Sequence, residues 1–356
     1  RLEVSAALRY DRYSDVGDTT NPKIGVNWTP VHGVTLRGSY GTSFRAPLFS
    51  QIYGNSSALF VQPYSDPTQG GAVIQGVALS GGNTNLKPET AETWSVGADL
   101  NPFPGANFSI TYWNVDYKGQ VEAYLADLAV LAKESQLAGT GVILRGQDAA
   151  ARVAQLLADG TPIARGVLPA QVTLFVDGRT QNLGRSITSG FDFIASYALE
   201  TESAGTFTLN ANATLITKYD VALSGGAEPT SRLNTIFNPL KFKGRAFLNW
   251  QKDNVLARVG INHIGGYDNN TLSGGAVQKV DSYNTVDAGI TLFVGDRHPA
   301  NFFEGGYSFR FDIQNLFDVD PPYVNFAPTV NGSGGYDASA SNPIGREFSV
   351  TVSKNF

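Results

Sequence analysis

Apolar and polar residues alternate along most of this chain. Near its end, the apolar positions are Phe348, Val350, Val352 and Phe356. The same alternation runs through residues 307–314 and 206–215. Successive side chains of a β-strand point to opposite faces of its sheet, so the pattern predicts strands with one apolar and one polar face.

The alternation marks about twelve segments, most of them roughly 9–13 residues long, the length that a tilted strand needs to cross a membrane. They are residues 1–13, 22–29, 34–44, 90–100, 106–117, 183–199, 205–219, 240–251, 255–267, 283–294, 307–317 and 344–356. No stretch approaches the roughly 18–20 consecutive apolar residues of a spanning helix. A closed barrel is the other structure that satisfies every backbone polar group in lipid. We therefore predict an all-β protein, a transmembrane antiparallel β-barrel.

The connections between these segments alternate in length. Short turns are expected at 30–33, 101–105, 200–205 and 252–254, and the somewhat longer 295–306 belongs to the same series. Long loops are expected at 45–89, 118–182, 220–239, 268–282 and 318–343. Outer-membrane barrels have short periplasmic turns and long extracellular loops, and a periplasmic C-terminus places every short turn on the periplasmic side.

The amino-acid composition limits the kinds of functional site that this chain can carry. Only 16% of the 356 residues are charged and the net charge is −5, which argues against nucleic-acid binding. Cysteine is absent, so disulfides and cysteine chemistry are excluded for this chain. The histidines, His32, His263 and His298, lie far apart without a second ligand at metal spacing. We predict no catalytic residue, no metal site and no cofactor.

Methionine is also absent, even at position 1, and the chain opens on a predicted strand without a signal peptide. We therefore expect a fragment or a processed portion of a longer protein. Aromatic residues gather near the predicted strand ends, where a barrel places its interfacial girdles. They are Trp28, Tyr40, Phe44, Trp94, Tyr112, Trp113, Tyr197 and Trp250.

The longest loop, 118–182, contains two helical patterns. One consists of Val121, Leu125, Leu128 and Ala132, and the other of Ala149, Val153, Leu156 and Leu157. A self-packed surface loop is the favoured interpretation, and a lid over a ligand mouth is the alternative.

Four motifs, spread nearly from end to end, resemble signatures of one protein family. They are Gly-Ser-Tyr-Gly-Thr-Ser-Phe-Arg-Ala-Pro at 38–47, Asn-Thr-Asn-Leu-Lys-Pro-Glu-Thr-Ala-Glu-Thr-Trp-Ser-Val-Gly at 83–97, Gln-Asn-Leu-Phe-Asp at 314–318 and the closing strand 344–356. Together they resemble the TonB-dependent outer-membrane receptors. Each motif also has a structural interpretation, in which Arg45, Pro47 and Pro88 fix where strands leave the membrane and 315–318 form a strand-ending turn.

The resemblance implies a barrel of about 22 strands closed around an N-terminal plug. This chain, 1–356, then supplies about the last 12 strands of the receptor barrel, and the plug, the TonB box and the first strands have no counterpart in it. The implied function is active uptake of a scarce nutrient of the iron siderophore, haem, cobalamin or glycan class across the outer membrane of a Gram-negative bacterium. The implied partners are outer-membrane lipid, a small-molecule nutrient, the barrel-assembly machinery, and TonB with ExbB and ExbD acting through the missing N-terminal part.

The closing strand also resembles the assembly signal of outer-membrane proteins, carried here by Phe348, Val350, Val352 and Phe356. Lys354 departs from it, but a lysine near the interface extends its ammonium to water. Candidate ligand-facing aromatics in the loops are Tyr53, Tyr64, Tyr267 and Tyr336, with Phe60 and Tyr323 as further members. A role as loop anchors is the favoured alternative for all of them.

Charged residues on the polar faces are expected to point into the lumen, because a mid-membrane Arg or Lys facing lipid costs about 2–4 kcal/mol. They are Arg9, Arg37, Lys243, Arg245, Arg258, Arg310, Asp312 and Glu347. We expect them to pair internally or to hold a plug rather than to contact substrate.

Two other classes of protein are also compatible with the sequence. A different outer-membrane barrel, such as a porin, an autotransporter translocator or a barrel phospholipase, suits about twelve strands if the chain is complete. A soluble β-rich binding protein predicts a chain that folds without detergent, and the alternating loop lengths argue against it.

Overall fold

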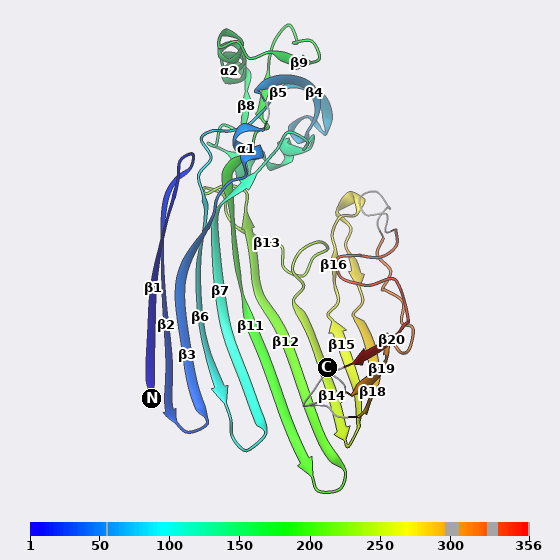
Figure 1. The fold of residues 1–356 in the computed structure, drawn as a ribbon. Coiled ribbons are helices and arrows are strands. Elements are labelled where there is room, and N and C mark those ends of the chain that lie inside the picture. Colours follow the sequence, from blue (N-terminus) through cyan, green and yellow to red (C-terminus); the bar gives the residue numbers. More distant parts are fainter. Residues whose placement is uncertain (55, 296–305, 326–333, 355–356) are drawn as a thin grey trace.

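A single tall antiparallel sheet dominates the structure (Figure 1). This computed structural model describes residues 1–54, 56–295, 306–325 and 334–354. The strands on the main path of the sheet follow one another in chain order, each paired with the next. They are β1 (Leu2–Tyr13), β2 (Gly17–Val31), β3 (Val34–Arg45), β6 (Glu89–Leu100), β7 (Ala106–Glu122), β11 (Gln181–Thr201), β12 (Gly205–Ala222), β14 (Phe242–Lys252), β15 (Val255–Ile264), β18 (Tyr283–Val294), β19 (Tyr307–Gln314) and β20 (Glu347–Lys354).

Every predicted segment overlaps one of these strands, so the alternation located the sheet correctly. The bounds differ most where strands continue beyond the length needed to cross a membrane. β7 reaches Glu122, β11 has 21 residues and β12 has 18. Phe356, the last residue of the predicted assembly signal, and His298 lie outside the described residues.

Short turns lie at one end of the sheet and large loops at the other (Figure 1). The β2–β3, β6–β7, β11–β12 and β14–β15 connections are the short ones, as the sequence predicts. The β1–β2 connection, at the loop end, is also a short turn. The other loop-end connections between neighbouring strands of the main sheet are long. The loop end therefore carries most of the additional structure of the chain.

The two faces of the sheet differ as predicted. One face carries rows of apolar side chains from neighbouring strands. Leu209, Leu248 and Val259 form one such row, and the cross-strand pair of Phe311 with Val350 is also apolar. These apolar side chains lie on an outer wall: Leu209 is 44% exposed, Phe309 45% and Val350 73%. A large, continuous apolar surface of this kind indicates contact with a membrane or a partner.

Charged residues mark where the apolar face ends. Above the ring pair Trp94–Tyr112, the same face of the sheet carries Arg185 paired with Asp116 and Lys118 paired with Glu92. Lys118 also lies 3.3 Å from Asp116. The upper parts of β7 and β11 therefore extend beyond the apolar band. Of the predicted girdle residues, Trp113 differs, because its neighbour Tyr112 faces the apolar side and Trp113 faces the opposite one.

The loops between β3 and β6 and between β7 and β11 fold together into one unit above the sheet, which we call the cap (residues 46–88 and 123–180; Figure 1). Its five-stranded sheet runs in the order β8 (Ile143–Arg145), β10 (Leu174–Asp177), β5 (Ala72–Ser80), β4 (Ala58–Asp66) and β9 (Ile163–Arg165). Its helices are α1 (Phe49–Tyr53), α2 (Gly146–Ala158) and the 3-10 segments η1 (Pro67–Gln69) and η2 (Val130–Leu137).

The second helical pattern predicted in this loop is confirmed by α2, which buries Ala149, Val153 and Leu156 while Leu157 stays 38% exposed. The first pattern, Val121, Leu125, Leu128 and Ala132, is wrong as a helix. β7 continues to Glu122, which pairs with Gln181 of β11, and the helical turn begins only at Val130. Cross-strand pairing therefore prevails over local periodicity at that point.

The remaining loops form a second cluster beside the cap (Figure 1). It contains the hairpin of β16 (Tyr267–Asn269) with β17 (Gln278–Val280) and the 3-10 segment η3 (Ser273–Gly275), whereas β13 (Thr230–Ser231) pairs with the end of β12 in the main sheet. Its core consists of Ile236, Leu240, Tyr267, Val280, Val324 and Ala340. No helix within the described residues is long and apolar enough to cross a membrane.

The edge strands β1 and β20 each pair on one side only within the described residues. Within the described residues the sheet is therefore open, with β1 and β20 as its two unpaired edges. Open sheet edges are not stable in a hydrocarbon layer.

The two faces generate a prediction for the complete protein. Val350→Arg places a charge on the apolar face and is expected to destabilise the folded barrel by about 2–4 kcal/mol. Ser349→Arg, one residue earlier, places the same charge on the polar face opposite Asp312 and serves as the control. Urea titration of folding into lipid vesicles measures the folding free energy of both variants. An equal loss of stability in the two variants would contradict the assignment of faces.

Candidate functional site

The polar face carries charged residues that mostly form pairs along the sheet. Arg37 approaches Asp99 to 2.6 Å and donates to Ser109 at 2.9 Å and Thr111 at 3.0 Å. Its guanidinium reaches these partners across Gly97, where an added Cβ would lie 3.3 Å from Arg37 and 2.7 Å from the Ile110 carbonyl oxygen. The missing side chain at Gly97 thus makes room for the bridge.

Two further predicted lumen-facing arginines are paired. Arg9 lies 2.7 Å from Asp11, and Arg310 lies 2.6 Å from Asp312. The expectation of internal pairing is confirmed for these residues and for Arg37. A role in holding a plug stays a prediction.

A different arrangement occurs in the middle of the same face, on β14 and β15. The guanidinium carbon of Arg258 lies 4.0 Å from the centre of the Phe247 ring, and that of Arg245 lies 5.3 Å away. Gly260 opposes Phe247 and leaves space for the ring. Within the described ranges, neither arginine has a salt bridge. Stacking on an aromatic ring holds each guanidinium while leaving its donors available to an acceptor.

A hollow of about 420 Å³ opens at the loop end of the polar face, beneath the cap. We call it the mouth hollow, and its lining includes Arg45, Glu89, Tyr117, Gln120, Glu122 and Ser186. Burial raises the pKa of Glu122, although the charges of Lys133 and Arg232 oppose that shift. The lining of the mouth hollow is therefore mainly polar.

Glu89 is the central residue of this site. Its side chain is only 2% exposed and forms an ion pair with Arg45 across β3 and β6. It also accepts hydrogen bonds from the Tyr117 hydroxyl at 2.8 Å and from the Val121 amide at 2.6 Å. One carboxylate thus joins β3, β6 and β7 where they leave the sheet for the cap.

Two of the sequence motifs meet at this joint. Arg45 belongs to the motif at 38–47, and Glu89 to the motif at 83–97. Lys87 of the second motif is held by Asn182 of β11. The Asn182 side chain accepts a hydrogen bond from the Lys87 amide and donates one to the Lys87 carbonyl, both at 2.8 Å. Arg45 is the last residue of β3 and Glu89 the first of β6, which agrees with a structural role of these motifs at strand ends.

The motif at 314–318 ends β19 as predicted. Asn315 and Asp318 both have left-handed backbone angles, at φ 50° and 56°. The Asn315 side chain accepts from the Val319 amide at 2.9 Å, and Asp318 accepts from the Arg346 amide at 2.7 Å. Asn and Asp are the side chains that tolerate this conformation best, because they form such local hydrogen bonds.

The cap has its own ion cluster, in which Asp66 is buried. Arg145 donates to Asp66 at 2.8 Å and to Glu134 at 2.8 Å, and the Asp66 side chain is fully buried. Thr68 also donates to Asp66 through its hydroxyl at 2.7 Å. The hydrogen bonds from Arg145, aided by Thr68, lower the pKa of Asp66 to about 2, although burial opposes the shift.

The predicted ligand-facing tyrosines fall into two groups. Tyr64 and Tyr267 are buried in the cores of the cap and of the second loop cluster, where they act as loop anchors and present almost no ring surface. The prediction that their rings face a ligand is therefore corrected by their burial. Tyr53 is 57% exposed on α1, where its ring lies 6.2 Å from that of the exposed Phe49, and Tyr336 is half-buried.

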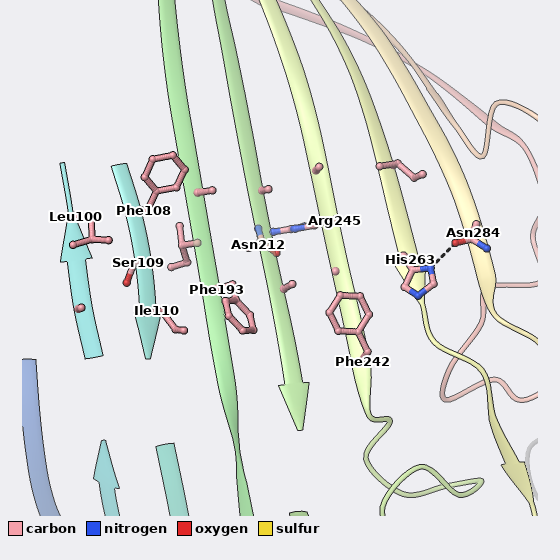
Figure 2. Close-up of a pocket in the computed structure, with 18 residues that line it drawn as sticks. Leu100, Phe108, Ser109, Ile110, Phe193, Asn212, Phe242, Arg245, His263 and Asn284 are labelled. Carbon is pink, nitrogen blue, oxygen red and sulfur yellow. Dashed lines mark hydrogen bonds between the residues drawn. The ribbon is translucent and has the colours of Figure 1, made fainter. Parts of the chain in front are cut away.

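The closing strand places Phe348, Val350 and Val352 on the apolar face, each more than half exposed. The Lys354 ammonium lies 5.4 Å from the centre of the Tyr307 ring. No group of His, Cys, Asp or Glu able to hold a metal ion occurs among the residues that the structure describes. Another hollow, of about 480 Å³, lies on the apolar face, away from the charged wall (Figure 2).

A comparison with known protein families decides the assignment. Residues 1–316 match the sequence model of the family described as TonB dependent receptor-like, beta-barrel. This chain belongs to the TonB-dependent receptor β-barrel family. Such barrels are outer-membrane proteins of Gram-negative bacteria, and they are transporters rather than enzymes.

Solved TonB-dependent receptors share the fold. The ferric enterobactin receptor PfeA of Pseudomonas aeruginosa has a TM-score of 0.63 and 18% identity, over 99% of this chain and 43% of that one. The siderophore receptor PirA of Acinetobacter baumannii has a TM-score of 0.64 and 16% identity, again over 99% of this chain and 43% of that one.

Among curated proteins, a hemin receptor of Yersinia pestis is 32% identical over 107 residues, which cover 28% of this chain and 15% of that protein. The chain thus spans less than half the length of each of these relatives. Sequence reasoning missed Glu89, Glu122 and the Asp66–Arg145 cluster, because only the fold brings their partners together.

The joint at Glu89 generates a prediction for the TonB-dependent receptor. Glu89→Ala is expected to destabilise the attachment of the cap by about 2–5 kcal/mol, because it leaves buried donors and Arg45 without their acceptor. Glu92→Ala removes only the exposed pair with Lys118 and is expected to cost at most about 1 kcal/mol. Hydrogen exchange of the cap backbone measures both effects, and similar exchange in the two variants would refute the central role of Glu89.

The low pKa of Asp66 generates a second prediction. A carboxyl group whose pKa is lower in the folded state stabilises that state above its unfolded pKa, about 3.9, and loses this effect as pH falls toward 2. We expect the cap to lose hydrogen-exchange protection, corrected for intrinsic exchange rates, as the pH falls from about 5 to about 2. Asp66→Asn should be less protected at neutral pH and lose less on acidification, whereas Asp159→Asn, at an exposed position, should behave like wild type. An unchanged acid response in Asp66→Asn would rule out this cluster as its cause.

Proposed function

We propose that the chain is the C-terminal barrel portion of an outer-membrane receptor that takes up a scarce nutrient with energy from the TonB system. Family membership is the observation that carries the proposal. The proposal extends to TonB, ExbB and ExbD as partners through a plug and TonB box outside this chain, and to the barrel-assembly machinery. It places the chain in the outer membrane, with the cap on the extracellular side.

We further propose a nutrient of the iron siderophore or haem class. This choice is supported by the names of the similar proteins, which are receptors for ferric enterobactin, siderophores and hemin. The mouth hollow fits a polar solute, because its lining is mainly polar and includes Gln120, Glu122 and Ser186 beside the Glu89 joint. Cobalamin and glycans stay as the alternative classes.

The cap and the lumen wall have separate parts in this proposal. The exposed ring pair of Phe49 and Tyr53 supplies a surface on which a planar ligand stacks. Below it, Arg245 and Arg258 present stacked guanidinium groups toward the lumen, where an acidic side chain of a plug would meet them. The Arg–Asp pairs along the rest of the polar face make the inner surface hydrophilic, and their charges cancel.

A growth experiment tests the proposed class of nutrient. Deletion of the whole gene in its own host is expected to abolish growth when a ferric siderophore or hemin is the sole iron source, while growth on abundant iron salts is unchanged. Growth of the deletion strain on every iron source, combined with loss of growth on a glycan or on limiting cobalamin, would overturn the iron assignment.

A binding experiment tests the ring pair. In the full-length receptor, Tyr53→Ala is expected to weaken binding of the ligand that supports growth by about 3- to 10-fold, because one aromatic contact contributes roughly 0.5–1.5 kcal/mol. Tyr40→Ala, which removes an exposed ring from the apolar face, should bind as wild type does. Equal affinities for wild type and Tyr53→Ala, measured by calorimetry, would remove Tyr53 from the ligand site.

A further inference from the structure

One hollow of the main sheet lies on its apolar face rather than on the lumen side (Figure 2). It has a volume of about 480 Å³ and a lining that is almost entirely apolar. Because the sheet belongs to an outer-membrane barrel family, this face is the one that meets lipid. A solute passing through the barrel does not reach it.

The hollow is a shallow groove that follows two adjacent rows of the sheet. One row, in register from β6 to β18, is Ala98, Ile110, Phe193, Ala213, Gly244, His263 and Asn284. The next is Leu100, Phe108, Ala195, Ala211, Ala246 and Ile261. Side chains two residues apart on a strand are roughly 7 Å apart, so the groove is about that wide.

Residue size explains why a groove exists here. Its floor on β11, β12 and β14 is made of the small residues Ala195, Ala211, Ala213, Gly244 and Ala246. Its walls carry large side chains, among them Phe108, Phe193 and Phe242, which Figure 2 shows around the floor. A bulky side chain at any floor position would fill the hollow.

The two ends of the groove lie near opposite ends of the sheet. Leu100 is the last residue of β6, next to a short turn, and marks one end. At the other end, His263 is the last residue but one of β15 and Asn284 is the second residue of β18, both next to the long loops. His263 Nδ1 and Asn284 Oδ1 are 2.6 Å apart (Figure 2). The groove is therefore polar at its extracellular end and apolar along its length.

We propose that this groove binds an acyl chain of an outer-leaflet lipid, with the polar part of the lipid against His263 and Asn284. The polar end lies next to the long loops and the apolar part runs toward a short turn, which matches the shape of a lipid whose headgroup lies on the loop side. A width of roughly 7 Å accepts a polymethylene chain but not an α-helix, which has a diameter of about 10–12 Å with its side chains. The inference rests on the proposed membrane placement and not on which nutrient is taken up.

Native mass spectrometry of the full-length receptor tests the proposal, with hexa-acylated lipid A as the probe lipid. The wild type is expected to retain one lipid A molecule more tightly than any other, and the groove-filling variant Ala211→Phe/Ala246→Phe is expected to bind it at least 10-fold more weakly. Ala257→Phe adds the same ring to the apolar face outside the groove and should bind as wild type does. Heat-modifiable mobility on gels verifies that each variant is folded.

The variant His263→Leu/Asn284→Leu tests the polar end separately and should weaken binding while the groove stays open. Equal lipid binding by the wild type and the groove-filling variant would overturn the proposal. So would a receptor dimer that the filling abolishes, because a second copy would then occupy the groove. Nutrient uptake by the folded groove-filling variant is expected to match the wild type, so failure of this proposal is distinguishable from failure of the proposed function.

Discussion

The whole structure depends on one constraint, which is that each strand of the sheet must face two different solvents. Period-two alternation meets this constraint, because it puts the apolar side chains of neighbouring strands into shared rows, such as Leu209, Leu248 and Val259. A shift of one residue between two strands would move all apolar side chains of one strand to the wet face. The constraint therefore fixes the register, and the register positions every other feature.

Charges follow from the same constraint. On the polar face they form pairs such as Arg37–Asp99, with Gly97 leaving room for a side chain that crosses a strand. On the apolar face, Asp116, Lys118 and Arg185 lie beyond the ring pair of Trp94 and Tyr112 and mark the upper limit of the apolar band. Lys354 lies at the opposite end of that face, next to the Tyr307 ring. Above that limit the strands no longer separate an apolar face from a polar one. Their loops form a compact unit with its own apolar core and an ion pair between buried Asp66 and Arg145.

The sequence predicted what the period-two pattern controls. The strands, the alternation of turns and loops, the exposed positions of Leu209, Phe309 and Val350, and the turn at Asn315 all agree with the structure. The cap sheet was not predicted, because β8, β9 and β10 are only 3–4 residues long and pair with strands far away in sequence. Glu89 was missed for a similar reason. Its partners Arg45, Tyr117 and Val121 become neighbours only after three strands have paired, and nothing in the motif itself shows that its carboxylate is buried.

The most direct test of the central claim is a scan of solvent accessibility along one strand. This chain has no cysteine, so single cysteines can be placed at successive positions of β19, from Tyr307 to Gln314, and spin-labelled in the full-length receptor reconstituted into vesicles. The account predicts that collisions with oxygen, which concentrates in lipid, peak at 307, 309, 311 and 313, while collisions with a water-soluble nickel complex peak at the positions between them. Accessibility without a period of two, or with the opposite phase, would contradict the account.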